Sequence, residues 1–277
     1  MTNTYCILNG QLIPHDEAKL HVDHIEFAYG FGVYENLKIR KDFVYFVDEH
    51  IDRLFHSARV IGLEHTLEKT RIREWIQILI EKNQTQDSNI KIILIGGKTA
   101  QDTLLYIFTL APKFIENKEY RDGVKAITYL FERFLPEAKT LNMLPSYVIF
   151  KKAQKQGCFD ALLIDHDTNI TEGTRSNFFA IKNKTLYTPR VEHVLDGVTR
   201  RTVIDCAKKN KYKIIEQNIA LKNVFDFDGA FFTNTSGKIV PIRTIDDRSF
   251  ETITDEIHTL QSLYNNYLDE YAKQHTQ

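Results

Sequence analysis

The stretch TEGTRSNFF, Thr171–Phe179, decides how this chain is interpreted, because it places a glutamate and an asparagine between two apolar runs. It follows the apolar run ALLID and the polar turn HDTN, and its two phenylalanines begin a further apolar run. Glu172 and Asn177 therefore lie near the adjoining ends of two predicted strands. Either both are solvated hairpin residues, or Glu172 is a carboxylate placed to hold a positive group.

The composition is that of a globular protein with one large domain or two modest ones. The chain has 277 residues, of which 43% are hydrophobic and 26% charged, with a formal net charge of -1. We therefore expect neither a nucleic-acid partner nor binding to an anionic membrane surface. Its 3 cysteines are far apart, which favours neither a disulfide framework nor a zinc site. No signal peptide or membrane-spanning run is visible, and we expect a cytoplasmic protein.

The order of the predicted elements indicates an α+β fold with two domains. Residues 1–113 mix strands and helices, beginning with a hairpin at Asn9-Gly10, and we predict a small α+β domain there. Residues 114–122 are polar with little periodicity, which predicts a linker. Residues 123–277 predict a larger β-rich domain with surrounding helices. The longer predicted helices cover residues 49–61, 67–82, 146–156, 199–209 and 255–273.

Two motifs suggest chemistry that their context does not support. GGKT, Gly96–Thr99, resembles the end of a phosphate-binding loop, but position 92 is Ile where that loop needs glycine, and a strand-like run follows. We interpret it as a hairpin turn. HVDH contains metal-ligating side chains, but their spacing fits no single helix or strand face, so we expect a surface loop and no metal site.

Lys139, in the segment RFLPEAKTLNML, has apolar neighbours on both sides. A lysine in a loop is usually solvated. In a partly dry cleft, however, desolvation disfavours its ammonium form and frees an amine nucleophile. The segment alone leaves both interpretations open.

Three further features are suited to an anion such as phosphate. The stretch LDGVTRRTV places Val198 and Thr199 where a loop becomes a helix, and backbone N–H groups at a helix start favour phosphate. The strand FFTNTSGKIVPI ends in hydroxyl and amide donors that include Thr235. Arg53 could offer a two-pronged guanidinium, although it falls off the apolar face of its helix. Each feature alone is also typical of an ordinary cap, turn or surface residue.

Taken together, these stretches resemble the class IV aminotransferases, pyridoxal-phosphate enzymes of fold type IV. That family includes branched-chain aminotransferases, D-amino acid aminotransferases and aminodeoxychorismate lyases. The resemblance covers most of the chain in order, through YGFGVYENLKI, DEHIDRLFHSARVIGL, AKTLNML, ITEGTRSNFFAIKNKTLYTPRVEHVLDGVTR and FFTNTSGKIVPI.

The resemblance implies a role for each candidate residue. Lys139 would form a Schiff base with the cofactor aldehyde, and Glu172 would keep the pyridine nitrogen protonated. Leu195 would pack on one face of the ring, and Tyr34 would face the substrate near its carboxylate. The resemblance also implies a homodimer that acts on an amino acid and a keto acid. The phosphate would be held by Arg53, Val198, Thr199 and Thr235.

The strand region IKIILIGGKTAQDTLLYIF departs from the aminotransferase pattern, because it lacks the arginine or histidine that those enzymes carry there. Lys91 matches the lysine of the lyase pattern, and Lys98 lies nearby in the loop. With Ser236, these lysines are our candidates for contacts to the substrate.

Three functions remain open on these residues. The first is amino-group transfer between an amino acid and a 2-keto acid, of the branched-chain or D-amino acid type. The second is a 4-amino-4-deoxychorismate lyase that releases pyruvate and 4-aminobenzoate. The third is a cofactor-binding homologue without turnover, and the missing arginine is the one feature in its favour.

Overall fold

The computed structural model describes residues 4–112 and 114–275, and the chain divides into two compact units. Unit 1 comprises Met1–Lys113 and Ala138–Met143, and unit 2 comprises Phe114–Glu137 and Leu144–Gln277. Each unit combines helices with a sheet, so the predicted α+β class is confirmed.

The segment that carries Lys139 belongs to unit 1 although it lies far along the chain. Thr140 forms a β-bridge with Val33, and the N–H of Leu141 donates to the carbonyl of Gly32 at 2.8 Å. These backbone bonds attach residues 138–143 to the start of a unit 1 strand. The predicted boundaries did not include this return of the chain, and the predicted boundary at residue 113 lies outside the described residues.

The stretch 114–122, predicted to be a linker, contains the helix α4 (Asn117–Asp122). A capping box begins this helix, in which the side chains of Glu116 and Glu119 accept hydrogen bonds from each other's backbone N–H groups. Local capping therefore orders a polar stretch that shows no hydrophobic period.

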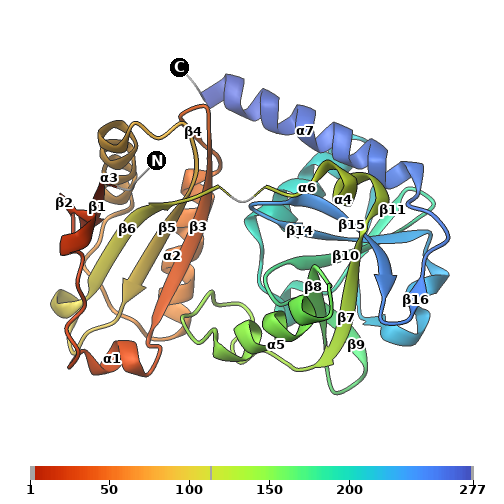
Figure 1. Ribbon diagram of the computed structural model, residues 1–277, viewed down its shortest axis with the longest axis horizontal. Helices are drawn as coiled ribbons and strands as arrows, with labels where there is room; N and C mark the ends of the chain where they lie inside the picture. The colour runs from red at the N-terminus through yellow and green to blue at the C-terminus, as the bar shows by residue number, and fades with distance from the viewer. Residues whose placement is uncertain (1–3, 113, 276–277) are drawn as a thin grey trace. The chain divides into compact units, whose positions relative to one another are not determined.

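Unit 1 is built on a six-stranded antiparallel sheet with the order β2-β1-β6-β5-β3-β4 (Figure 1). The predicted turn joins β1 to β2, with positive φ at both Asn9 and Gly10. GGKT lies in the connection between the antiparallel strands β5 and β6, as the hairpin interpretation predicts. The strands are β1 (Tyr5–Leu8), β2 (Gln11–Pro14), β3 (Gly32–Arg40), β4 (Phe43–Val44), β5 (Asp87–Ile95) and β6 (Leu104–Leu110).

Helices cover one face of this sheet. The helices α2 (Val47–Val60) and α3 (Lys69–Asn83) pack their apolar sides on β3, β1 and β6, and a short α1 (Ile25–Ala28) precedes β3. The core between them is almost entirely aliphatic, because alternate residues of β3 and β5 point toward the helices. The opposite face of β3 and β5 carries Tyr34 and Lys91.

The helix α2 begins at Val47, two residues before its predicted start at residue 49. Phe46 adopts a left-handed backbone with φ of 55°, which ends the extended conformation after β4. Asp48 lies in the first helical turn, where its negative charge interacts favourably with the helix dipole.

Unit 2 contains a ten-stranded mixed sheet with the order β12-β11-β10-β14-β15-β7-β8-β9-β13 and with β16 beside β15 (Figure 1). An additional pairing of β9 with β10 closes the strands β10, β14, β15, β7, β8 and β9 into a ring. The strands are β7 (Val124–Leu130), β8 (Asp160–Ile164), β9 (Asn169–Gly173), β10 (Asn177–Lys182), β11 (Thr185–Thr188), β12 (Lys213–Glu216), β13 (Ile219–Ala220), β14 (Gly229–Asn234), β15 (Lys238–Ile245) and β16 (Arg248–Ser249).

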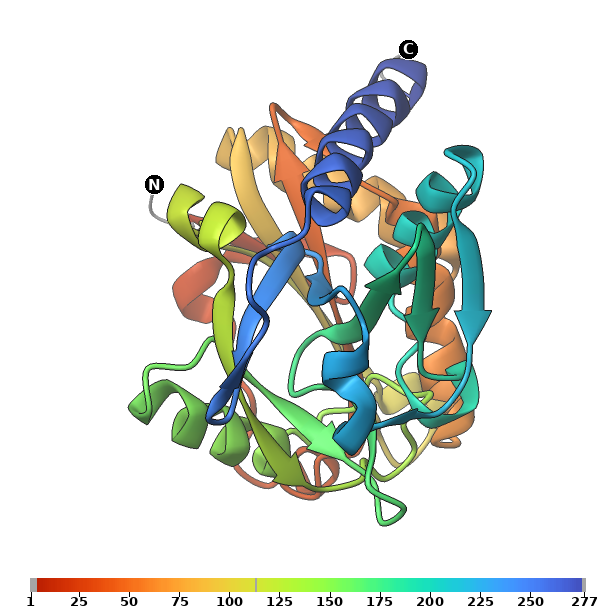
Figure 2. The ribbon, with the colours of Figure 1, turned by 90° about the vertical axis from the view of Figure 1, so that its right-hand side faces the viewer.

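Helices lie around this sheet (Figure 2). The helix α5 (Leu144–Lys155) packs on β7 and β8, while α6 (Val198–Lys209) packs on β14 and on α7 (Asp255–His275). Each of these three helices begins within two residues of its predicted start. Among the described residues, no helix is long and apolar enough to cross a membrane.

Candidate active site

Glu172 is a buried carboxylate at the end of β9, with 3% of its surface exposed. Its Oε1 accepts a hydrogen bond from Arg133 Nη1 at 3.1 Å. Its Oε2 accepts one from the backbone N–H of Leu195 at 3.2 Å and a longer one from Asn177 Nδ2 at 3.5 Å. The solvated hairpin interpretation is therefore wrong for Glu172. Its carboxylate is fixed by donors from three separate segments.

Asn177 connects β9 to the segment that precedes α6. It lies directly opposite Glu172 in the β9–β10 pairing, and its Nδ2 donates to the carbonyl of Leu195 at 2.7 Å. On its other side Asn177 lies opposite Thr233 of β14. The side chains of Glu172, Asn177 and Thr233 therefore form a row on one face of the sheet, which we call the Glu172 row. The Oγ1 of Thr233 is buried and has no hydrogen-bond partner among the described residues. A polar row with an unsatisfied buried hydroxyl is suited to a polar ligand.

The start of α6 lies against the same row. Gly197 is the residue before the helix, and a Cβ built on it would lie 2.0 Å from Asn177 Oδ1, so only glycine fits there. No side chain caps the helix. The first backbone N–H groups, which include those of Val198 and Thr199, have no partner inside the helix, and they are the donors that bind phosphate at helix starts.

Thr235 and Ser236 lie in the turn between β14 and β15, two and three residues beyond Thr233. The turn is held by Asn234, whose Oδ1 accepts a hydrogen bond from the N–H of Gly237 at 2.7 Å. The predicted phosphate residues of unit 2 therefore lie on elements adjoining the Glu172 row.

In unit 1, two lysines lie against one tyrosine ring. Lys139 is partly buried, and its Nζ lies 4.6 Å from the centre of the Tyr34 ring. Two backbone bonds fix this residue: its N–H donates to Ser57 Oγ, and its carbonyl accepts from the N–H of Tyr34, both at 3.0 Å. Lys91 Nζ lies 3.5 Å from the centre of the same ring. Burial, reinforced by the positive charge of Lys139 and opposed by Glu35, lowers the pKa of Lys91 to about 7. Lys98 is exposed in the loop after β5.

Arg53 is buried, with 7% exposed, so it is not an ordinary surface residue of its helix. Its Nε and Nη2 donate to Glu35 at 2.6 and 2.8 Å, and His50 Nδ1 lies 2.7 Å from the same carboxylate. Burial alone would raise the pKa of Glu35, but Arg53 and His50 together hold it well below its usual range. Burial also lowers the pKa of His50, against the opposing effect of Glu35, so that residue stays neutral near pH 7.

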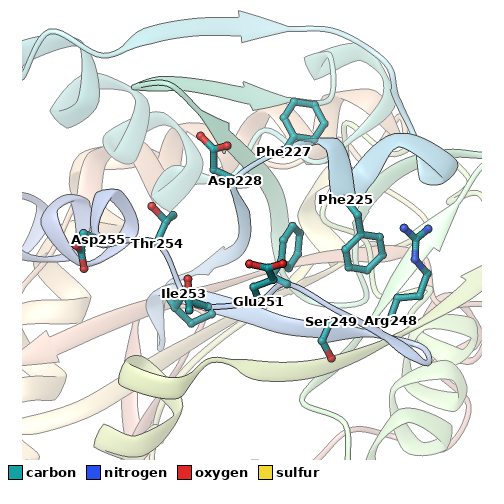
Figure 3. Close-up of a pocket in the computed structure, with 11 residues that line it drawn as sticks. Phe225, Phe227, Asp228, Arg248, Ser249, Glu251, Ile253, Thr254 and Asp255 are labelled. Carbon is teal, nitrogen blue, oxygen red and sulfur yellow. The ribbon is translucent and has the colours of Figure 1, made fainter.

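The surface of unit 2 also contains a depression of about 920 Å³, drawn in Figure 3. It is formed by residues around β16 and the start of α7, where Arg248 lies 4.2 Å from the centre of the Phe225 ring. None of the predicted site residues lines it. It is therefore separate from the Glu172 row.

Comparison with known proteins identifies the family. Residues 32–245 match the family model described as amino-transferase class IV. The chain belongs to the class IV aminotransferase family.

Relatives within this family cover almost the whole chain. A D-alanine aminotransferase of Bacillus licheniformis is 29% identical over 96% of this chain and 98% of its own length. A branched-chain-amino-acid aminotransferase of Pseudomonas aeruginosa is 26% identical over 87% of this chain and 84% of its own.

Solved structures share the fold. The branched-chain amino acid aminotransferase of Escherichia coli has a TM-score of 0.87 at 22% identity, covering 96% of this chain and 95% of that one. A Legionella pneumophila protein assigned as a 4-amino-4-deoxychorismate lyase has a TM-score of 0.83 at 26% identity, covering 91% and 97%.

The residues of this class IV chain fit a pyridoxal-phosphate group. The unsatisfied Thr233 hydroxyl and the uncapped start of α6 offer donors for a phosphate. Glu172, buried beside them, offers a carboxylate for a protonated ring nitrogen.

Sequence reasoning missed three residues of these clusters: Arg133, Glu35 and His50. A signal for Glu35 was present in the alternation of β3, where Val33, Leu37 and Ile39 are fully buried, so Glu35 between them had to face the same core. A charge at such a position needs a partner.

Proposed function

We propose that this chain is a pyridoxal-phosphate-dependent aminotransferase that transfers an amino group between an amino acid and a 2-keto acid. The observation that carries the proposal is the buried Glu172, held by Arg133 and Leu195 beside the uncapped start of α6. An anchored carboxylate and a phosphate-binding helix start match the two charged ends of this cofactor. The relatives named as D-alanine and branched-chain aminotransferases support a substrate of one of these two types.

When bound, pyridoxal phosphate supplies an aldehyde and an electron-withdrawing ring. In our proposal, Glu172 holds the proton on the ring nitrogen, and Lys139 holds the cofactor through its ε-amine. Lys139 also carries the proton that leaves the substrate α-carbon. Leu195 packs against the ring. The residues proposed to hold the phosphate are Arg53, Val198, Thr199 and Thr235.

The substrate side of the proposal consists of Tyr34, Lys91, Lys98 and Ser236. We further propose a homodimer, as the resemblance implies, and a cytoplasmic location.

A lyase that releases pyruvate from 4-amino-4-deoxychorismate is the second candidate. Two observations favour it: the lysine at position 91, which matches the lyase pattern, and the likeness to the Legionella pneumophila protein. The two reactions begin with the loss of the same α-proton and differ in their later steps.

Borohydride trapping tests the proposal directly. Protein incubated with pyridoxal phosphate and then reduced should carry one stable pyridoxyl label on Lys139, located by peptide mass spectrometry. Lys139→Ala should remove the label, whereas the exposed Lys155→Ala on α5 should retain it. A label on another lysine, or none, would refute the assignment.

An amino-donor screen then separates the two activities. L-alanine, D-alanine and L-leucine are offered with 2-oxoglutarate, and keto acid formation is followed. A keto acid from any donor supports the transferase. Pyruvate formed only from 4-amino-4-deoxychorismate would replace it with the lyase.

A further inference from the structure

Lys91 has no counter-ion among the residues that the structure describes. It is only partly exposed, on the sheet face opposite α2 and α3, yet its Nζ makes no hydrogen bond or ion pair within the described part of the chain. By contrast, the buried Arg53 is paired with Glu35, and the exposed Lys69 is paired with Asp52. The Lys91 ammonium instead contacts the face of the Tyr34 ring.

The strand register shows why no acid of these strands reaches Lys91. Asn36 of β3 and Phe108 of β6 lie directly opposite it, and the titratable residues one pleat further along these strands are Tyr34, Lys38 and Tyr106. None of these is a carboxylate. Glu35, the acid that does act on Lys91, projects from the other face of β3, where His50 and Arg53 already occupy it.

An ammonium in such surroundings has already lost part of its hydration. Contact with an aromatic face returns about 1–2 kcal/mol, which is less than a counter-ion would. A carboxylate that binds at Lys91 Nζ gains a direct charge-assisted hydrogen bond, and the lysine loses little further hydration because it is already partly buried. The position is therefore prepared for an anion.

Lys139 is the second cation against the Tyr34 ring. Two like charges in one partly dry place disfavour each other, so a charge on Lys139 opposes a charge on Lys91. Burial and then Lys139 are the two causes that lower the pKa of Lys91 to about 7. The charge on Lys91 consequently depends on the charge on Lys139.

We propose that Lys91 is the receptor for the carboxylate of the substrate, and that Lys139 controls its charge. The inference rests on the proposed function, in which the Lys139 amine is taken up by the cofactor. While the Lys139 amine carries a positive charge, Lys91 is poised between its neutral and charged forms. Once that positive charge is lost, Lys91 stays charged at neutral pH and accepts an anion, so cofactor loading prepares the site for substrate. A lysine thereby takes the place of the arginine that this strand lacks.

The test uses the protein without cofactor, labelled with ¹³C at lysine Cε, and follows each lysine by NMR as pH changes. The Lys91 signal is assigned by its loss in Lys91→Met. In Lys139→Met, the titration midpoint of Lys91 should rise by about one pH unit. Lys82→Met is the matched control, because Lys82 also lies over a tyrosine, Tyr5 at 5.2 Å, but is exposed. It should leave the midpoint unchanged.

Propionate serves as the carboxylate probe at pH 7.5. A rise in midpoint from about 7 to about 8 increases the charged fraction of Lys91 about threefold, so Lys139→Met should bind propionate about threefold more tightly than the wild type. Lys91→Met should abolish the binding. Tryptophan fluorescence of Trp75, the single tryptophan of the chain, checks that unit 1 of each variant is folded.

Two results would overturn the proposal. An unchanged Lys91 midpoint in Lys139→Met would remove the coupling, and propionate binding that survives in Lys91→Met would remove the receptor. Neither measurement uses pyridoxal phosphate. A failure of the proposed function would appear separately, as absence of the label on Lys139 after reduction.

Discussion

Replacing Lys91 with methionine should stabilise the cofactor-free protein at neutral pH and should do so less as the pH rises. The physical reason is the burial of an ammonium without a counter-ion. Burial and Lys139 lower its pKa from 10.5 to about 7 in the folded chain. Between these two values the unfolded chain binds a proton that the folded chain does not, so the wild type gains stability as pH rises. The methionine variant lacks this dependence.

The size of the effect can be calculated from the two pKa values. Each pKa unit corresponds to about 1.36 kcal/mol. The wild type should therefore bear a penalty of ~4.5 kcal/mol at pH 6.5, which falls to ~1.5 kcal/mol at pH 9.5. Loss of the contact with Tyr34 offsets part of the gain in the variant by about 1–2 kcal/mol. The change of ~3 kcal/mol between the two pH values is the sharper expectation.

Urea unfolding followed by tryptophan fluorescence measures the free energy of unfolding of unit 1, the unit that contains Lys91, because Trp75 packs against the core of unit 1. The free energy of unfolding is compared between Lys91→Met and wild type at pH 6.5, 8 and 9.5. Lys82→Met, with its exposed ammonium over Tyr5, should differ from wild type by a nearly constant amount. A difference for Lys91→Met that does not change with pH would show that Lys91 is either paired or well hydrated, and the reasoning would be refuted.

Three further outcomes are expected. Glu35→Gln should destabilise unit 1 by about 3–5 kcal/mol at pH 7 in the Trp75 unfolding assay, because it removes the carboxylate charge that is paired with the buried Arg53. Since the folded pKa of Glu35 is depressed, its contribution in the wild type is present above the unfolded value of about 4.3 and is lost as pH falls below it, so the effect of Glu35→Gln should shrink in acid. Gly197→Ala should weaken pyridoxal-phosphate binding by about tenfold, measured by fluorescence titration, since its Cβ would clash with Asn177 Oδ1 and displace the start of α6. Glu172→Gln should keep cofactor binding but slow the exchange of the alanine α-proton with deuterated water by about 100-fold, followed by NMR, while the exposed Glu270→Gln should match the wild type.

Each of these three expectations has a contrary outcome. Wild-type stability of Glu35→Gln at pH 7 would show that Arg53 finds another partner. Unchanged affinity in Gly197→Ala would remove the start of α6 from the phosphate site. An unaltered exchange rate in Glu172→Gln would remove this carboxylate from the step at the α-carbon.

The sequence predicted elements with strong local patterns well. The alternation of β5 and the helical period of α6 each depend on residues close together in the chain, so their local pattern is enough to predict them. The return of residues 138–143 to unit 1 could not be predicted in this way. It depends on backbone contacts of residues 139–141 with residues 32–34, which lie more than a hundred residues earlier in the chain, and no period marks it.

In the candidate site, too, local features could be predicted and contacts between distant segments could not. The position of Glu172 between two strands was visible in the sequence, but its contact with Arg133 joins a strand end to an irregular segment 39 residues earlier. The burial of Arg53 could not be predicted, because helix periodicity reports only which side chains are apolar. Arg53 lies outside the apolar stripe of its helix, but it is buried because it forms an ion pair with the buried Glu35 on β3.

Glu35 and Lys91 show two opposite ways of burying a charge on neighbouring strands. Glu35 accepts four hydrogen bonds, from His50, from two nitrogens of Arg53 and from the N–H of Asn36, and its pKa is depressed. Such a carboxylate remains charged at all physiological pH values and fixes the elements around it. Lys91 has no acid partner in the described part of the chain, and its pKa is displaced toward the neutral form. An anionic ligand would recover part of the free energy lost by burying this ammonium, because the described residues provide no anion for it. That asymmetry is why we assign a structural role to Glu35 and His50 and a binding role to Lys91.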